Sequence, residues 1–194
     1  MKKEDWYRYI LAVVILICLV LLFLANVFSI TGHATEGSTY SNVTIQKYLA
    51  ISFSTNLSDG ILFGDIATLP AVNINATHNY DDGSDGSTMY IAVSNDSNTP
   101  VDFCTKGNDD LTSIAADTIG LANETYHNST TTDITNPDVA AEISLTTSYV
   151  KSGNNVAVGT NNYYRFWLDI PVAQPSGSYN NTVSFKGVTT GVSC

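Results

Sequence analysis

The stretch ILAVVILICLVLLFLANVFSI, from Ile10 to Ile30, decides the architecture of this chain. It contains no charged residue, and only Asn26 and Ser29 interrupt its apolar character. At the α-helical rise of about 1.5 Å per residue, such a run reaches roughly 30 Å, the thickness of the hydrocarbon core of a bilayer. A helix on the surface of a soluble protein would carry a polar face, and this stretch has none. The sequence therefore predicts one transmembrane helix at residues 10–30.

Positive charge is distributed unevenly around the apolar stretch. Lys2, Lys3 and Arg8 precede it, and the next basic residue is Lys47. Because an excess of Lys and Arg marks the cytoplasmic side of a membrane helix, we expect residues 1–9 in the cytoplasm and the remainder of the chain outside. The protein is thus expected in the cell membrane as a single-pass chain with an extracellular C-terminal domain.

The apolar stretch has a second possible fate, because secretory signal peptides also begin with positive charge and an apolar core. Gly32 and Ala34 supply small residues at the spacing of a signal peptidase site, so cleavage after Ala34 would yield a secreted protein. The apolar run is longer than the usual signal core of about 7–15 residues, which favours an uncleaved signal-anchor.

Composition limits what the exported part can be. Of the 194 residues, 8 are Lys or Arg and 18 are Asp or Glu, and an acidic chain without a basic cluster argues against nucleic acid as a partner. Asn, Ser and Thr supply most of the polarity, and these residues favour strands and turns over helices. Residues 31–43 are expected to form either a tether or an exchangeable strand that pairs with a neighbour, and residues 44–194 one extracellular domain.

Alternation of apolar and polar residues recurs along this domain, with Gly, Asn, Asp or Pro between the segments. The alternating segments lie at 45–53, 71–75, 89–94, 101–106, 141–149, 163–170 and 179–186. They predict an all-β fold: an antiparallel β-sandwich of seven to nine strands, Ig-like or jelly-roll-like, after the N-terminal transmembrane helix. Turns are expected at 56–60 and 152–155, and one or two helical turns within 108–125.

Three cysteines are present, and Cys18 lies within the apolar stretch. Cys104 and Cys194 remain for an oxidising exterior, where a disulfide between them is the expected state. Such a bridge closes a loop of about 90 residues and would stabilise the fold by roughly 4–5 kcal/mol. The alternatives are two free thiols, or a Cys194 bridge to another chain. Alternation places Cys104 on the solvent side of its strand, so the bridge is expected to hold the C-terminal segment across the sheet.

A run of three carboxylates and two glycines, Asp81-Asp82-Gly83-Ser84-Asp85-Gly86, is a candidate calcium-binding loop. It is not an EF-hand loop, because Ala92 stands where a bidentate Glu is required. Asp81, Asp82 and Asp85 would be the ligands of a looser site. The alternative is a solvated hairpin loop, which Asp and Gly favour in any case.

Catalytic patterns are missing from the sequence, so we expect no enzymatic activity and no cofactor. The three histidines are scattered over loop or tether segments, and no Cys or His pair has zinc-binding spacing. No serine lies in a Gly-x-Ser-x-Gly nucleophile elbow.

Sites for N-linked sugars are frequent, as expected for an exported glycoprotein. Seven asparagines begin an Asn-x-Ser/Thr sequon, namely Asn42, Asn56, Asn75, Asn95, Asn123, Asn128 and Asn180.

One strand carries an unusual polar face. Tyr163, Arg165 and Trp167 alternate with the apolar residues of segment 163–170. Aromatic residues and Arg are enriched at the centres of interfaces, and aromatic rings stack on sugar rings. This face is therefore a candidate interaction surface. The alternatives are that another segment covers it, or that the strand is buried on both faces.

The end of the domain resembles exported β-sandwich domains of archaeal and bacterial surface proteins, most strongly over residues 166–188. The residues that carry the resemblance are Phe166-Trp167-Leu168-Asp169-Ile170-Pro171, Gln174-Pro175, Gly177, Tyr179 and Asn181-Thr182-Val183-Ser184-Phe185. The order of apolar N-terminus, short polar segment and sandwich is similar to archaeal pilin-like subunits that lend a strand to a neighbour. Lys3-Glu4 is a poor prepilin peptidase site, so the chain departs from type IV pilins.

These observations favour a structural, glycosylated protein of the cell surface that is membrane-tethered through residues 10–30. We expect it to assemble with itself or with other surface proteins into a filament or envelope. The alternative is an adhesin or glycan-binding module that uses Tyr163, Arg165 and Trp167. A third reading, an accessory subunit of an exported enzyme, has no distinguishing feature in the sequence.

Overall fold

The computed structural model describes residues 3–27, 39–79, 88–132 and 141–194. The chain divides into two compact units, Met1–Thr44 and Ile45–Cys194. The boundary lies within one residue of the start expected for the extracellular domain.

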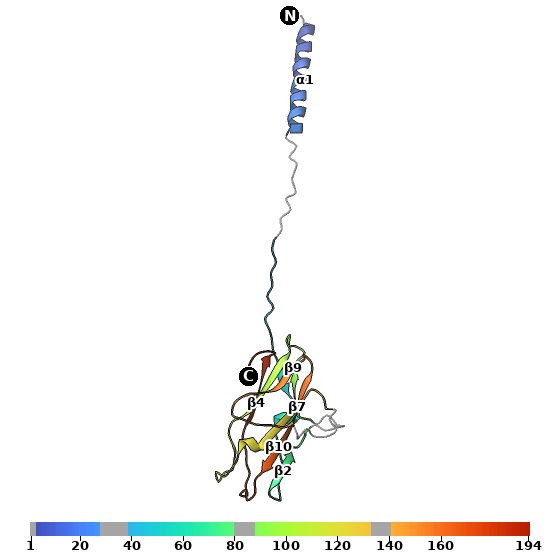
Figure 1. Cartoon of the computed structure of the whole chain (residues 1–194). Helices are drawn as coiled ribbons and strands as arrows, with labels where there is room; N and C mark the ends of the chain where they lie inside the picture. The colour runs from blue at the N-terminus through green and yellow to red at the C-terminus, as the bar shows by residue number, and fades with distance from the viewer. Residues whose placement is uncertain (1–2, 28–38, 80–87, 133–140) are drawn as a thin grey trace. The chain divides into compact units, whose positions relative to one another are not determined.

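The first unit contains helix α1, Lys3–Val27 (Figure 1). Its segment Lys3–Leu24 is long and apolar enough to cross a membrane, and none of it is buried within the protein. A signal sequence near an N-terminus has the same character, so the helix fits either fate of the apolar stretch. The helix begins before the expected residue 10, because Trp6, Tyr7 and Tyr9 continue the helical segment toward the N-terminus.

The larger β-sheet of the second unit is antiparallel and is built around β10, Asn161–Ile170. One edge of β10 pairs with β7 along six residues, and the other edge pairs with β3 and then with β2. The other strands of this sheet are β1 (Ile51–Phe53), β2 (Ala71–Asn75), β3 (Tyr90–Val93), β7 (Glu124–Ser129) and β8 (Ile143–Ser144).

The second sheet has three antiparallel strands, with β4 (Val101–Gly107) in the middle. Its partners are β9 (Val150–Val156) and β11 (Val183–Thr189). A separate small hairpin joins β5 (Leu111–Thr112) to β6 (Thr118–Ile119).

The hydrophobic core lies between the two sheets. Phe103 of β4 and Tyr164 and Phe166 of β10 are completely buried. Phe185 of β11 packs edge-on against Tyr164 with a ring-centroid distance of 5.2 Å, and against Phe53 of β1 at 5.6 Å. These contacts between sheets confirm the predicted antiparallel β-sandwich. The described residues form eleven strands and not seven to nine, because β5 and β6 are only two residues long and β7 lies at residues 124–129, where no alternating segment was recognised.

Three local predictions were wrong. Residues 152–155 continue β9 and do not turn. The predicted turn at 56–60 is instead the short helix α2, Thr55–Asp59, because the hydroxyl of Ser54 accepts a hydrogen bond from the backbone N–H of Leu57 and caps it. The expected helical turns within 108–125 shrink to the 3₁₀ turn η1, Leu121–Asn123, after the β5–β6 hairpin.

A chain of buried hydroxyls links the two sheets within this core. Ser152 of β9 lies 2.6 Å from the hydroxyl of Thr105 on β4 and 3.0 Å from that of Tyr164 on β10. The hydroxyl of Tyr126 on β7 is also buried, but it has no hydrogen-bond partner among the described residues. Burial raises the pKa of Tyr126 to about 12, so its hydroxyl stays protonated at neutral pH.

This contrast predicts opposite effects for two matched substitutions. Tyr164→Phe should destabilise the protein by about 1 kcal/mol or more, because it leaves the hydroxyl of Ser152 with one partner fewer. Tyr126→Phe should leave stability unchanged or raise it by up to about 1 kcal/mol, because it removes an unsatisfied buried polar group. Guanidinium unfolding of the full chain in detergent, followed by the fluorescence of buried Trp167, measures both. An equal loss in the two variants would contradict the difference between the hydroxyls.

Candidate functional site

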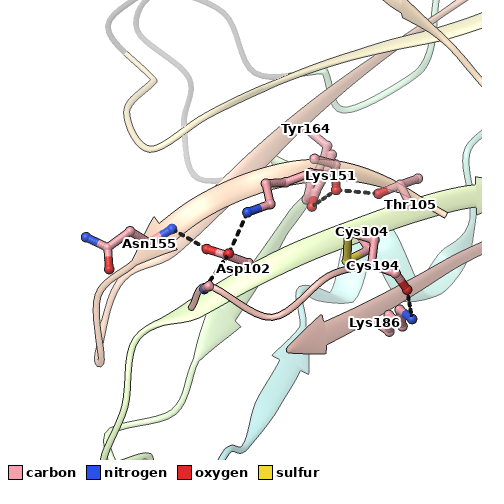
Figure 2. Close-up of a disulfide and its surroundings, with 10 residues drawn as sticks. Asp102, Cys104, Thr105, Lys151, Asn155, Tyr164, Lys186 and Cys194 are labelled. Atoms are coloured by element: carbon pink, nitrogen blue, oxygen red, sulfur yellow. Dashed lines mark hydrogen bonds and ion pairs between the residues drawn. A yellow bond between two sulfur atoms is a disulfide. The ribbon is translucent and has the colours of Figure 1, made fainter. Parts of the chain in front are cut away.

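The C-terminal segment is fixed to the outer face of β4 by a disulfide between Cys104 and Cys194 (Figure 2). Their Cα atoms lie 5.8 Å apart, within the usual range for disulfides. The ammonium group of Lys186 on β11 donates a hydrogen bond to the backbone carbonyl of Cys194. The predicted pairing is therefore present, and it holds the C-terminal segment across the sheet as expected.

The prediction that Cys104 lies on the solvent side was wrong, since its exposed fraction is 0%. Cys104 does lie on the face of β4 opposite to Phe103, as the alternation indicated. That face is not open to water, because the C-terminal segment lies over it (Figure 2).

Asp102 provides a second attachment for this segment. Its carboxylate accepts hydrogen bonds from the ammonium of Lys151 at 2.6 Å, the backbone N–H of Asn155 at 2.7 Å and the backbone N–H of Gly191 at 3.1 Å (Figure 2). Burial by itself would raise the pKa of Asp102, but these hydrogen bonds and the charge of Lys151 lower it to about 2. The Asp102 side chain is therefore ionised at neutral pH. Its carboxylate links β4, β9 and the C-terminal segment through hydrogen bonds.

The candidate interaction face is buried, so its prediction as an exposed surface was wrong. Arg165 is 0% exposed and Trp167 is 1% exposed, and Tyr163 is half-buried. The indole N–H of Trp167 donates to the side-chain oxygen of Asn75 at 2.8 Å, and Tyr163 packs against Tyr90. β10 is thus buried on both faces over most of its length, which alternation cannot distinguish from a strand with one face in water.

The sequons occupy different environments. Asn42, Asn75, Asn95 and Asn180 are exposed, whereas Asn56, Asn123 and Asn128 are partly buried. The amide nitrogen of Asn128, the atom to which a sugar would be attached, donates to Asn162 at 3.1 Å. The exposed sequons have the accessibility that glycosylation needs, and use of any of the seven stays a prediction.

The predicted calcium site stays a prediction. Asp81, Asp82 and Asp85 lie outside the described residues. Within the described parts of the chain, no group of three or more His, Cys, Asp or Glu side chains is placed to hold a metal ion.

The sandwich also contains a groove. Residues within 60–69 and 174–183 and Phe185 of β11 contribute to its lining, and its volume is about 1250 Å³. Sequence reasoning missed it, because its walls come from segments that are far apart in the chain. Small-molecule pockets measure roughly 300–1,000 Å³, so the groove is large for such a ligand.

Apolar and polar side chains both line the groove. Phe53, Leu168, Val183 and Phe185 contribute to its walls. Glu124 also lines it, and the amide of Asn181 donates to the Glu124 carboxylate at 2.8 Å. Burial raises the pKa of Glu124, and the hydrogen bond from Asn181 opposes that shift in part.

The attachment at Asp102 predicts a specific acid sensitivity. The pKa of Asp102 is lower in the folded protein than its ordinary value of 3.8, so its stabilising effect is complete above that value and is lost as the pH falls toward 2. A shift of this size corresponds to about 2 kcal/mol. Asp102→Asn should therefore lower the free energy of unfolding at pH 7 by at least about 2 kcal/mol and flatten its decline between pH 5 and pH 2.

Unfolding of the full chain across this pH range measures the effect. Asp59→Asn, at an exposed carboxylate, is the matched control and should leave the pH profile unchanged. An Asp102→Asn profile parallel to that of the unsubstituted chain would show that Asp102 is not the group that titrates.

Comparison with known proteins does not assign the chain to a family. No protein-family model, no curated protein and no solved structure matches the chain.

Proposed function

We propose that the chain is a structural protein of the cell surface: a β-sandwich domain outside the cell, held at the membrane by α1, that assembles with copies of itself. The observation that carries this proposal is the combination of one exposed apolar helix with a domain that contains a disulfide. α1 has no partner face within the described residues, and a bilayer supplies the apolar environment that its side chains need.

The disulfide supports an extracellular domain. Cys104 and Cys194 are joined, and disulfides form and persist outside the cytoplasm. Lys2, Lys3 and Arg8 before the apolar stretch favour the same orientation. Cleavage after Ala34 would release the domain, and either fate delivers residues 39–194 to the exterior.

Self-assembly is supported by unpaired surface on the domain. Among the described strands β11 is an edge strand, and Val183 and Phe185 near its start contribute apolar side chains to the groove. A free strand edge beside apolar surface favours pairing with another chain. The alternative, a glycan-binding module, loses its basis because Arg165 and Trp167 are buried.

Labelling of single cysteines in intact cells tests the topology. Ser58→Cys, at an exposed position of the domain, should react with a membrane-impermeant maleimide in intact cells. Asp5→Cys, near the start of α1, should react only after permeabilisation. Labelling of Asp5→Cys in intact cells, or a domain recovered from the cytosol with reduced Cys104 and Cys194, would overturn the topology.

Sedimentation of the full chain in mild detergent tests assembly separately. Species larger than a monomer are expected, and their fraction should rise with concentration. A chain that stays monomeric at all concentrations, with Ser58→Cys labelled as expected, would remove self-assembly and keep the surface location.

A further inference from the structure

One acidic side chain lies on the core face of the larger sheet. Glu124 begins β7, and its register partner on β10 is Leu168. Residues paired in register point to the same face of a sheet, so Glu124 shares a face with Leu168 and, two residues further along β7, with the pair of Tyr126 and Phe166. These three neighbours are buried, and Glu124 itself is 1% exposed. Burial of an ionised carboxylate is costly unless a cation or several hydrogen-bond donors surround it.

The protein itself supplies little of that compensation. The amide of Asn181 donates to one carboxylate oxygen of Glu124 at 2.8 Å, and it is the one side-chain donor to Glu124 among the described residues. An ionised carboxylate can accept about four hydrogen bonds. Burial raises the pKa of Glu124, and the hydrogen bond from Asn181 opposes this only in part. The surroundings of Glu124 therefore disfavour its ionised form.

The lining of the groove indicates what kind of ligand could reach this carboxyl group. Among the described lining residues, the charged ones are Glu124 and the exposed Asp65, and none is Lys, Arg or His. Leu111, Ile119 and Leu168 also line the groove and form one buried apolar cluster. An anion would meet like charges there and no cation. The charges and the apolar walls together favour a positively charged ligand with an apolar body.

We propose that the groove binds an apolar organic cation, a hydrocarbon or aromatic body with one ammonium group, and that the ammonium donates to Glu124. The ammonium supplies the charge and the donors that Glu124 lacks, and charge-assisted hydrogen bonds are stronger than neutral ones. The apolar body is buried against the walls. The aromatic rings of the lining also attract cations, and they belong to Phe53, Phe63, Tyr179 and Phe185.

The site lies within one copy of the domain, so this inference does not depend on self-assembly. The whole groove, at about 1250 Å³, is larger than a pocket for one small molecule. The ligand therefore fills the part of the groove next to Glu124.

Three probes with one carbon skeleton test the preference for positive charge. The full chain in phosphatidylcholine nanodiscs is titrated at pH 7 with phenylbutylamine, phenylbutanol or phenylbutanoate, and nanodiscs without protein correct for partition into lipid. Calorimetry should show the amine binding at least about tenfold more tightly than the alcohol, because a charged hydrogen bond replaces a neutral one. The carboxylate should bind more weakly than the alcohol. Equal affinities, a preference for the carboxylate or no binding of the amine would overturn the inference.

Two substitutions locate the ammonium. Glu124→Gln keeps an acceptor for Asn181 but removes the charge, so it should weaken amine binding by about tenfold or more and change phenylbutanol binding little. Asp65→Asn removes the other charge of the lining and is the matched control, with little effect on either probe. Equal weakening by both substitutions would show that the overall negative potential attracts the amine, and would remove Glu124 as its contact.

The stability of the same variant distinguishes a binding role from a structural one. Because burial raises the pKa of Glu124 above its ordinary value of 4.5, its contribution to stability is complete below that value and is lost as the pH rises. Glu124→Gln should therefore leave the free energy of unfolding at pH 7 unchanged or raise it. A variant that is less stable but binds the amine normally would assign Glu124 a structural role and overturn the inference.

A photoreactive amine places the ligand in the domain. Benzoylbenzylamine should label residues within 60–69 or 174–183 of the full chain, as read by mass spectrometry of the digested protein. Excess phenylbutylamine should suppress this labelling, and Glu124→Gln should reduce it several-fold. Labelling confined to α1, or to parts of the domain away from the groove, would show partition into lipid or binding elsewhere and would overturn the groove as the site.

Discussion

The sandwich depends on one strand that is buried on both faces. β10 pairs with three other strands, and its inward face supplies Tyr164 and Phe166 to the core. Its opposite face holds Arg165 and Trp167 away from water as well. Large side chains are buried on both faces of β10. A shift of its register against β2, β3 or β7 would move every one of them to a different neighbour, so this burial fixes the register of the three pairings.

The second sheet is positioned by polar as well as apolar contacts. The hydroxyls of Thr105, Ser152 and Tyr164 connect β4 and β9 to β10 inside the core. Outside the core, the disulfide and Asp102 attach the C-terminal segment to β4. Buried hydrogen bonds are directional, so they define the position of one sheet over the other more narrowly than apolar packing does.

The two faces of β4 are covered in different ways. One face of β4 packs into the core, and a covalently fixed segment covers the other. β11, directly beside it, pairs only with β4 among the described strands, and its residues Val183 and Phe185 line the groove. Edge strands of soluble monomers are usually protected by charge, proline or a covering segment.

Much of this molecule follows from its sequence. The apolar run predicts α1, alternation predicts β2, β3, β4 and β10, and an oxidising exterior predicts the bridge between Cys104 and Cys194, because each depends on local periodicity or on residue chemistry. Only the tertiary structure decided the rest. Whether Trp167 and Cys104 face water depends on segments remote in sequence that lie over them, and the groove exists only where residues from 53 to 185 meet. Periodicity records which side chains share a face of a strand, but the packing of distant segments determines whether that face is buried.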